Sequence, residues 1–435
     1  MQARKYIKYL FFFSVFILSL MATQLGKTVV LISDFINILL LCCLFHNRHK
    51  LSSAISLLGK NICVIFILLI ILGVVSSLIN FIQPITTLWG FRTFYRYAIY
   101  FISCIVFLNI RDCIYYEKWL RNILLVNFLF STVQFFLLNQ IGDINSGTMS
   151  GNGGLYVLCY ICLTYYIISY IYQRISLKTM AIYLSLVLFI AIFAELKIVF
   201  LLIPATYGLC ILLAKKTRNS FKSILFVTVF CAVGLSVIAV FQGDRYVEAL
   251  TNKDDLVEYS TRKGGYNFTE EGINRGIALE LTDDLFYSDN SIQRYLGMGI
   301  GTGSASSIIA SPFFQRYGRL LSYHFFMTSY LLIEQGWIGF VLYVVLWISI
   351  LLRLKVMKLH DDFYMFWRTF GIVLTIQILV SIWYNASLVL DDVWFLFLYL
   401  AIPFIYYKQY QSAIVQIKPY KNGVRGVSIT NTILP

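Results

Sequence analysis

Residues 61–82 read NICVIFILLIILGVVSSLINFI, an apolar stretch without a single charged side chain. A helix needs about 20 such residues to cross the hydrocarbon core of a bilayer, so this stretch predicts a membrane-spanning helix. Lipid offers the backbone no hydrogen-bond partners, and apolar runs that enter it are therefore helical. The stretch predicts an all-α membrane protein.

The composition extends this prediction to the whole chain. Hydrophobic residues make up 59% of the sequence, charged residues only 13%, and the mean hydropathy is +0.76. A soluble domain usually carries about 25% charged residues. We predict a polytopic protein of about twelve membrane-spanning helices. The expected spans are residues 8–24, 28–45, 61–82, 93–110, 119–139, 154–172, 179–194, 196–213, 222–241, 322–351, 369–386 and 393–408.

The basic residues predict the orientation of these spans. Cytoplasmic loops of membrane proteins are enriched in Lys and Arg. Most of the 35 basic residues fall in every second loop and in the two tails, which places both termini in the cytoplasm. The net charge of +14 is spread over these loops, so no basic domain remains to bind nucleic acid.

One segment between the ninth and tenth spans differs from the rest. Residues 242–321 hold about half of the 21 acidic residues together with many glycines, and the alternation of loops places them outside the cytoplasm. The predicted organisation is helices 1–9 in residues 1–241, this large loop in 242–321, helices 10–12 in 322–408 and a cytoplasmic tail in 409–435.

Charged residues near membrane depth are the first candidates for function, because a charge in lipid is costly. Arg92 and Arg96 have the i, i+4 spacing that places them on one helix face, where they bind either lipid phosphates or an anionic substrate. Asp34 stands alone inside its span, where a bridged polar contact is expected. Glu195 and Lys197 interrupt an apolar run where the chain should turn, which is also consistent with a plain turn.

The large loop supplies further basic residues and a glycine series. Arg262, Arg275 and Arg294 precede Gly297-Met-Gly-Ile-Gly-Thr-Gly303. The series does not have the spacing of a dinucleotide-binding fingerprint. It is either a flexible connection to the next span or a set of exposed backbone amides that hold phosphate oxygens. The glycines concerned are Gly299, Gly301 and Gly303.

Two further candidates, His324 and Glu334, fall within the span predicted for residues 322–351. On one helix they would lie about 15 Å apart and could not act as a direct pair. A satisfied histidine at the membrane surface is the alternative to a functional one. Asp391 and Asp392 precede the last span and are interpreted as acids at a helix N-terminus, where the helix dipole favours them.

The order of these motifs resembles the O-antigen polymerase and O-antigen ligase superfamily. The resemblance rests on the glycine series ending in Gly303-Ser304, on His324, and on Glu334-Gln-Gly336-Trp-Ile-Gly339. The number of spans, the place of the large loop and the arginine pair agree with it over most of the chain. Phe325 stands where the family usually has Asn, and Lys197 where it usually has Arg. The resemblance implies a GT-C-like fold in the bacterial inner membrane.

The same resemblance implies glycosyl transfer on the periplasmic face, without a metal or other cofactor. An O-antigen polymerase joins undecaprenyl-diphosphate-linked oligosaccharides at the membrane surface, and membrane lipid and a chain-length regulator are its implied partners. His324 would either accept the proton of the attacking hydroxyl or orient or bind the substrate. Arg275 resembles the family's loop arginine, and Arg262 and Arg294 are the alternative matches. Diphosphate and substrate contacts are implied for Arg92, Arg96, Lys197, Arg262, Arg294, Gly299, Gly301, Gly303 and Glu334.

Three other functions stay open at this point. An O-antigen ligase passes the finished polymer to the lipid A core, although the departures at Lys197 and Phe325 favour a polymerase. A lipid-linked oligosaccharide flippase is a transporter with many spans, but it is expected to have short loops. A subunit without activity would leave glycan output unchanged when His324 and Arg275 are replaced.

Overall fold

The computed structural model describes residues 2–18, 21, 27–214, 273–288, 290–306, 308–359 and 361–417. In this part of the chain the fold is all-helical, as predicted. The described residues form no β-strand, and their only β-type pairing is an isolated bridge between Ala305 and Ala310. The predicted ninth span, the first part of the large loop with Arg262, and the tail beyond residue 417 lie outside the described residues.

The described helices fall into two runs along the chain. The first run contains α1 (Gln2–Phe12), α3 (Val30–His46), α4 (Arg48–Leu58), α5 (Lys60–Ile79), α6 (Pro84–Phe107), α7 (Ile110–Phe136), α8 (Asn152–Ile171), α9 (Leu177–Phe193) and α10 (Lys197–Ala214). The second contains α14 (Ala278–Tyr287), α15 (Ser291–Leu296), α16 (Pro312–Leu321), α17 (Met327–Val356), α18 (Asp362–Tyr384) and α19 (Trp394–Ile417). Two short turns matter below, η4 (Tyr323–Phe325) and η5 (Ser387–Val389).

Six of the described helices are long and apolar enough to cross a membrane, namely α5, α7, α8, α10, α17 and α18. Helices α3 and α4 pass the same test together but are bent by 97° at their junction. The chain is therefore a helical membrane protein, with up to 7 such spans among the described residues if the bent pair counts as one. The larger number expected from the sequence stays a prediction.

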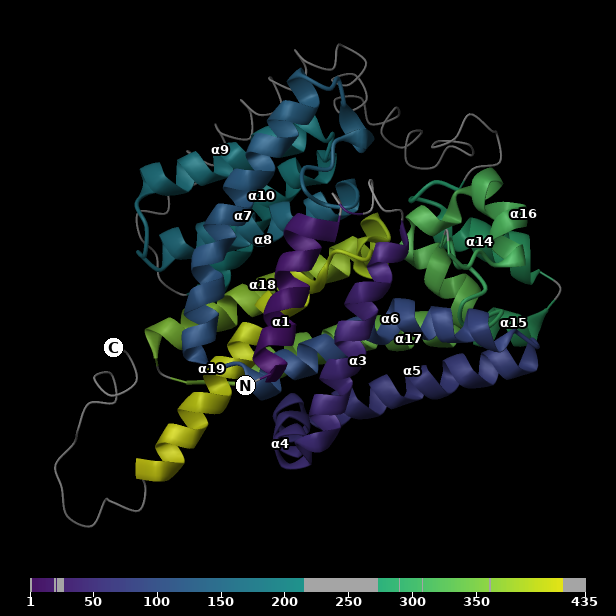
Figure 1. Cartoon of the computed structure of the whole chain (residues 1–435), viewed down its shortest axis with the longest axis horizontal. Coiled ribbons are helices and arrows are strands. Elements are labelled where there is room, and N and C mark those ends of the chain that lie inside the picture. Colours follow the sequence, from purple (N-terminus) through teal and green to yellow (C-terminus); the bar gives the residue numbers. More distant parts are fainter. Residues whose placement is uncertain are drawn as a thin grey trace.

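Figure 1 shows how these helices are arranged. Helix α17 packs against α5 and α18, and α18 in turn packs against α8 and α19. Helices α14 and α15 lie against α17 at the end of the molecule where α5 turns into α6. Helix α4 lies at the opposite end of α5. The part of the large loop that the structure describes is therefore folded against one end of the helices.

The glycine series is packed between α17 and the α5–α6 hairpin. A Cβ atom on Gly336 would lie 2.5 Å from the nitrogen of Gly297, and one on Gly301 would lie 2.1 Å from the carbonyl oxygen of Thr86. Gly336 has φ 61° and ψ −170°, which breaks α17 into two helices. This backbone region is essentially confined to glycine. The span predicted for residues 322–351 is therefore interrupted, and His324 lies before it in η4.

Replacing Gly336 with alanine should destabilise the fold by about 1–3 kcal/mol, because alanine is strained at positive φ and its Cβ would meet the glycine series. Gly208→Ala is the matched control, since a Cβ at Gly208 would have open space around it. The thermal midpoint of the detergent-purified protein measures both changes. Equal midpoints for the two variants would contradict the packing role of Gly336.

Candidate functional site

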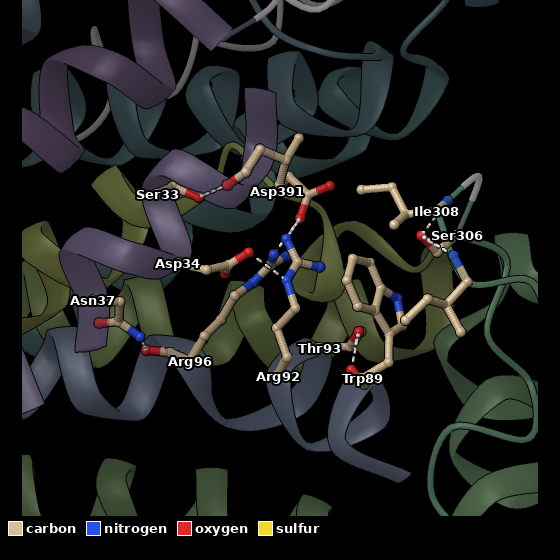
Figure 2. Close-up of polar contacts among 12 residues, drawn as sticks. Ser33, Asp34, Asn37, Trp89, Arg92, Thr93, Arg96, Ser306, Ile308 and Asp391 are labelled. Carbon is tan, nitrogen blue, oxygen red and sulfur yellow. Dashed lines mark hydrogen bonds and ion pairs between the residues drawn. The ribbon is translucent and has the colours of Figure 1, made fainter. Parts of the chain in front are cut away.

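The arginine pair predicted from the sequence lies inside α6, and a loop between α18 and α19 faces it (Figure 2). The helix begins at Pro84, earlier than the predicted start at residue 93. One oxygen of Asp391 binds both guanidinium groups, with a distance of 2.9 Å to Nη2 of Arg92 and a direct contact to Nη1 of Arg96. Nε of Arg92 donates to Asp34 in α3 at 2.6 Å. The polar contact expected for Asp34 is therefore present.

The two arginines differ in their exposure and in whether an N–H donor remains available to a ligand. The side chain of Arg96 is 2% exposed, and its Nη2 donates to the carbonyl oxygens of Val389 at 2.8 Å and Leu390 at 2.7 Å. Arg92 is 15% exposed, its guanidinium lies 4.4 Å from the ring centre of Trp89, and its Nη1 makes no hydrogen bond with a described residue. Arg96 is thus an anchor of the fold, whereas Arg92 has a donor to offer to a ligand.

The charges of this cluster balance, because two guanidinium groups face two carboxylates. Burial by itself would raise the pKa of Asp391, but the positive charges of Arg96 and Arg92 outweigh it and hold that pKa below its ordinary value. Asp391 is therefore ionised at neutral pH and supplies the counter-ion of a buried arginine. A buried charge that loses its partner is strongly destabilising.

Residues 385–392, which we call the α18–α19 corner, also hold Asp392. This carboxylate is fully buried, and its Oδ2 accepts hydrogen bonds from the nitrogen of Ser150 at 2.8 Å and from its Oγ at 2.9 Å. Burial raises the pKa of Asp392 to about 6. The helix N-terminal role expected for Asp391 and Asp392 was incomplete, because the first ties the corner to α6 and the second ties it to the start of α8.

His324 and Arg275 flank the other end of this corner. The nitrogen of Ala386 donates to the carbonyl oxygen of Phe325, next to His324, at 2.9 Å. The guanidinium carbon of Arg275 lies 4.3 Å from the ring centre of Tyr384, the last residue of α18. One short segment of chain therefore contacts Arg275 at Tyr384 and the neighbour of His324 at Ala386.

The environment of His324 differs from that of an exposed imidazole. Its ring centre lies 4.2 Å from that of Phe325 and 5.1 Å from that of Phe314. Burial lowers the pKa of His324 to about 4, whereas the reference value is about 6.5. The imidazole is therefore neutral at neutral pH and can accept a proton, but as a weaker base than the sequence alone suggests.

The glycine amides expected to bind phosphate are occupied by the protein. Glu334 is fully buried, and its two oxygens accept hydrogen bonds from the nitrogen of Gly301 at 2.8 Å and of Gly303 at 3.0 Å. The nitrogen of Ile300 donates to Oγ of Ser77 at 3.0 Å, and a Cβ on Gly299 would lie 2.6 Å from a side-chain carbon of Ile82. This arrangement contradicts the expectation of a phosphate cradle at Gly301 and Gly303, and it makes Glu334 the residue that positions the glycine series.

The remaining basic candidates are placed elsewhere. Arg294 binds Asp283 of α14 through Nε at 3.0 Å and Nη2 at 2.5 Å, and Asp283 also accepts from Trp337. Arg294 thereby joins α15 to α14 and α17. Lys197 begins α10, which packs against α8, α9 and α18. The turn predicted at Glu195 is present, since α9 ends at Phe193 and α10 begins at Lys197.

Sequence reasoning named the arginines but missed their shared partner. The available signal was charge balance, since charges near membrane depth are paired with one another. Asp391 is one of two acids in the loop before the last span, on the side of the membrane predicted for Arg92. Nothing in the local pattern shows that its carboxylate faces α6 and not solvent.

No metal ligand set stands out in this site. The described ranges contain no group of three or more His, Cys, Asp or Glu residues that could hold a metal ion. The carboxylates nearest the arginines, Asp34 and Asp391, are both bound to guanidinium groups.

No family model matches the chain, and neither a curated protein nor a solved structure matches it. The function is therefore argued from the residues and their geometry.

We expect Asp391→Asn to destabilise the protein more than Asp34→Asn. The first removes the ion-pair partner of buried Arg96, whereas Arg92 keeps Asp391 when Asp34 is neutralised. Removing one partner of a buried pair costs about 3–5 kcal/mol. Asp284→Asn makes the same chemical change at an exposed position of α14 and should have no effect. Thermal midpoints at neutral pH test the order, and equal losses at Asp391 and Asp34 would contradict it.

Proposed function

We propose that this protein is a membrane-embedded glycosyltransferase of the O-antigen polymerase type. It joins undecaprenyl-diphosphate-linked oligosaccharide repeat units on the periplasmic face of the bacterial inner membrane. The observation that carries this proposal is that the short segment from Tyr384 to Asp391 contacts Arg275 at Tyr384, the neighbour of His324 at Ala386, and both Arg92 and Arg96 at Asp391. The motif order in the sequence supports the same chemistry.

The reaction needs stabilisation of a departing diphosphate. A hydroxyl of the acceptor glycan attacks the anomeric carbon of the donor, a new glycosidic bond forms, and the bond to the diphosphate breaks with its electron pair. Donors aimed at that developing negative charge lower the barrier. Arg92 supplies such a donor through Nη1, held in direction by Trp89 and Asp34. Arg96 keeps the corner in place and does not itself need to reach the substrate.

The proton of the attacking hydroxyl needs an acceptor. His324 is neutral at neutral pH and can take a hydrogen bond from the hydroxyl, which orients the nucleophile. As the new bond forms the proton moves to the imidazole, and a pKa of about 4 means that His324 releases it readily to water. Arg275, stacked on Tyr384, adds positive charge at the same corner. Glu334 acts only by holding the glycine series.

A lipid-linked oligosaccharide flippase is the second candidate. The observation that favours it is the balanced cluster of Asp34, Arg92, Arg96 and Asp391 among the helices. Charges inside a helical membrane protein often mark the path of a transported substrate. A ligase shares the chemistry of the first proposal and differs from it in the acceptor.

The lipopolysaccharide gel profile of host cells lacking this protein separates these functions. A core with a single repeat unit is expected, because polymerisation alone would be lost. A bare core with long polymer on undecaprenyl diphosphate would mean a ligase, and a bare core with single repeats trapped on the cytoplasmic side would mean a flippase.

Complementation tests the residues. Arg275→Ala and His324→Ala should each reduce polymer by about a hundredfold or more, since they remove charge stabilisation and the proton acceptor. Arg316→Ala, an exposed arginine of α16, is the matched control and should restore the full ladder. Unchanged ladders in both test variants at normal protein levels would overturn the catalytic assignment.

A further inference from the structure

Helix α4 is bent sharply away from α3, the helix that precedes it. The 97° bend after α3 means that, if α3 crosses the bilayer, α4 runs along its surface. One side of α4 is buried through Ala54, Leu57 and Leu58, and the helix packs against α5 and α6. The other side faces away from the protein, at the end of the molecule opposite α14 and α15 (Figure 1).

The exposed part of α4 is rich in hydroxyl groups and carries a basic residue at each of its two edges. Its exposed polar residues are Arg48, His49, Lys50, Ser52, Ser53 and Ser56. The first turn of the helix contains no acidic residue. Cations in a first turn are disfavoured by the helix dipole, so an anion bound beside them would offset this repulsion. Serine hydroxyls can donate hydrogen bonds to phosphate oxygens.

One basic residue of this face interacts electrostatically with a cation of another helix. Lys50 of α4 and Arg4 of α1 both repel the ammonium group of Lys408 in α19. Asp112 pairs with Arg4 at 3.6 Å.

Apolar side chains lie next to the basic face. Phe45, near the end of α3, is 59% exposed, and Ile55 on α4 is 40% exposed. A ligand with an anionic headgroup and apolar chains matches both parts of this surface.

We propose that the exposed face of α4 binds the phosphate headgroups of anionic phospholipids in the leaflet at that end of the protein. Basic residues near a membrane surface are attracted to anionic headgroups, and a helix beside the spans meets those headgroups directly. This face is outside the α18–α19 corner, so the proposal does not rest on the glycosyl-transfer function.

The test compares two charge-matched double variants of the full chain. Arg48→Gln with Lys50→Gln changes the proposed face, whereas Lys118→Gln with Arg121→Gln removes two exposed basic residues from α7. Phosphatidylglycerol or phosphatidylcholine is titrated into the detergent-purified protein, and the bound lipid and the thermal midpoint are measured. Phosphatidylglycerol should raise the midpoint of the wild type and of the α7 variant, and its affinity for the α4 variant should fall about tenfold or more.

The outcomes are distinct. Equal loss of phosphatidylglycerol affinity in the two double variants would mean that the affinity depends on the total positive charge of the protein. That result would overturn a binding site on α4. Equal stabilisation by phosphatidylcholine would overturn the selectivity for anionic headgroups. If the α4 double variant does not fold, Lys50→Gln alone is measured in the same titration, and unchanged affinity in that variant would also overturn the proposal.

Discussion

The carboxylate of Asp391 is the constraint on which the candidate site depends. One of its oxygens contacts both Arg92 and Arg96, and this contact joins α6 to the loop that precedes α19. Arg96 is almost fully buried, so its charge requires a partner within the protein. The carbonyl oxygens of Val389 and Leu390 complete the binding of Arg96 and set the path of the loop. The loop is fixed at this end. At its other end the nitrogen of Ala386 donates to Phe325 of η4, and Tyr384 lies against Arg275.

A second buried carboxylate organises the neighbouring region by a different interaction. Glu334 has no ion-pair partner among the described residues and is held by the amides of Gly301 and Gly303. The resulting contact fixes the glycine series against α17, and the break at Gly336 leaves room for the backbone of Gly297. Two motifs that the sequence presents as a possible ligand site therefore form one packing unit. The availability of Arg92, and not of the glycine amides, is what supports anion binding.

Several local expectations succeeded because they depend on short-range properties. The spans predicted at residues 61–82, 154–172 and 196–213 match α5, α8 and α10 to within a few residues, since the length of an apolar run is a property of the run itself. The start of α6 was placed too late because Thr86 and Thr87 weaken the apolar signal, although Pro84 is a favourable first residue of a helix. The break at Gly336 was missed because a glycine within an apolar run gives no sign of its backbone angles.

The sequence by itself determined the helical membrane character, the i, i+4 arginine pair and the identity of His324 and Arg275 as candidates. These follow from hydropathy, helix periodicity and motif order, which are readable along the chain. Only the tertiary structure decided that Asp391 neutralises the arginines, that Glu334 occupies the glycine amides and that burial lowers the pKa of His324. Each of these depends on which groups from distant segments share a low-dielectric environment, and no local pattern specifies that neighbourhood.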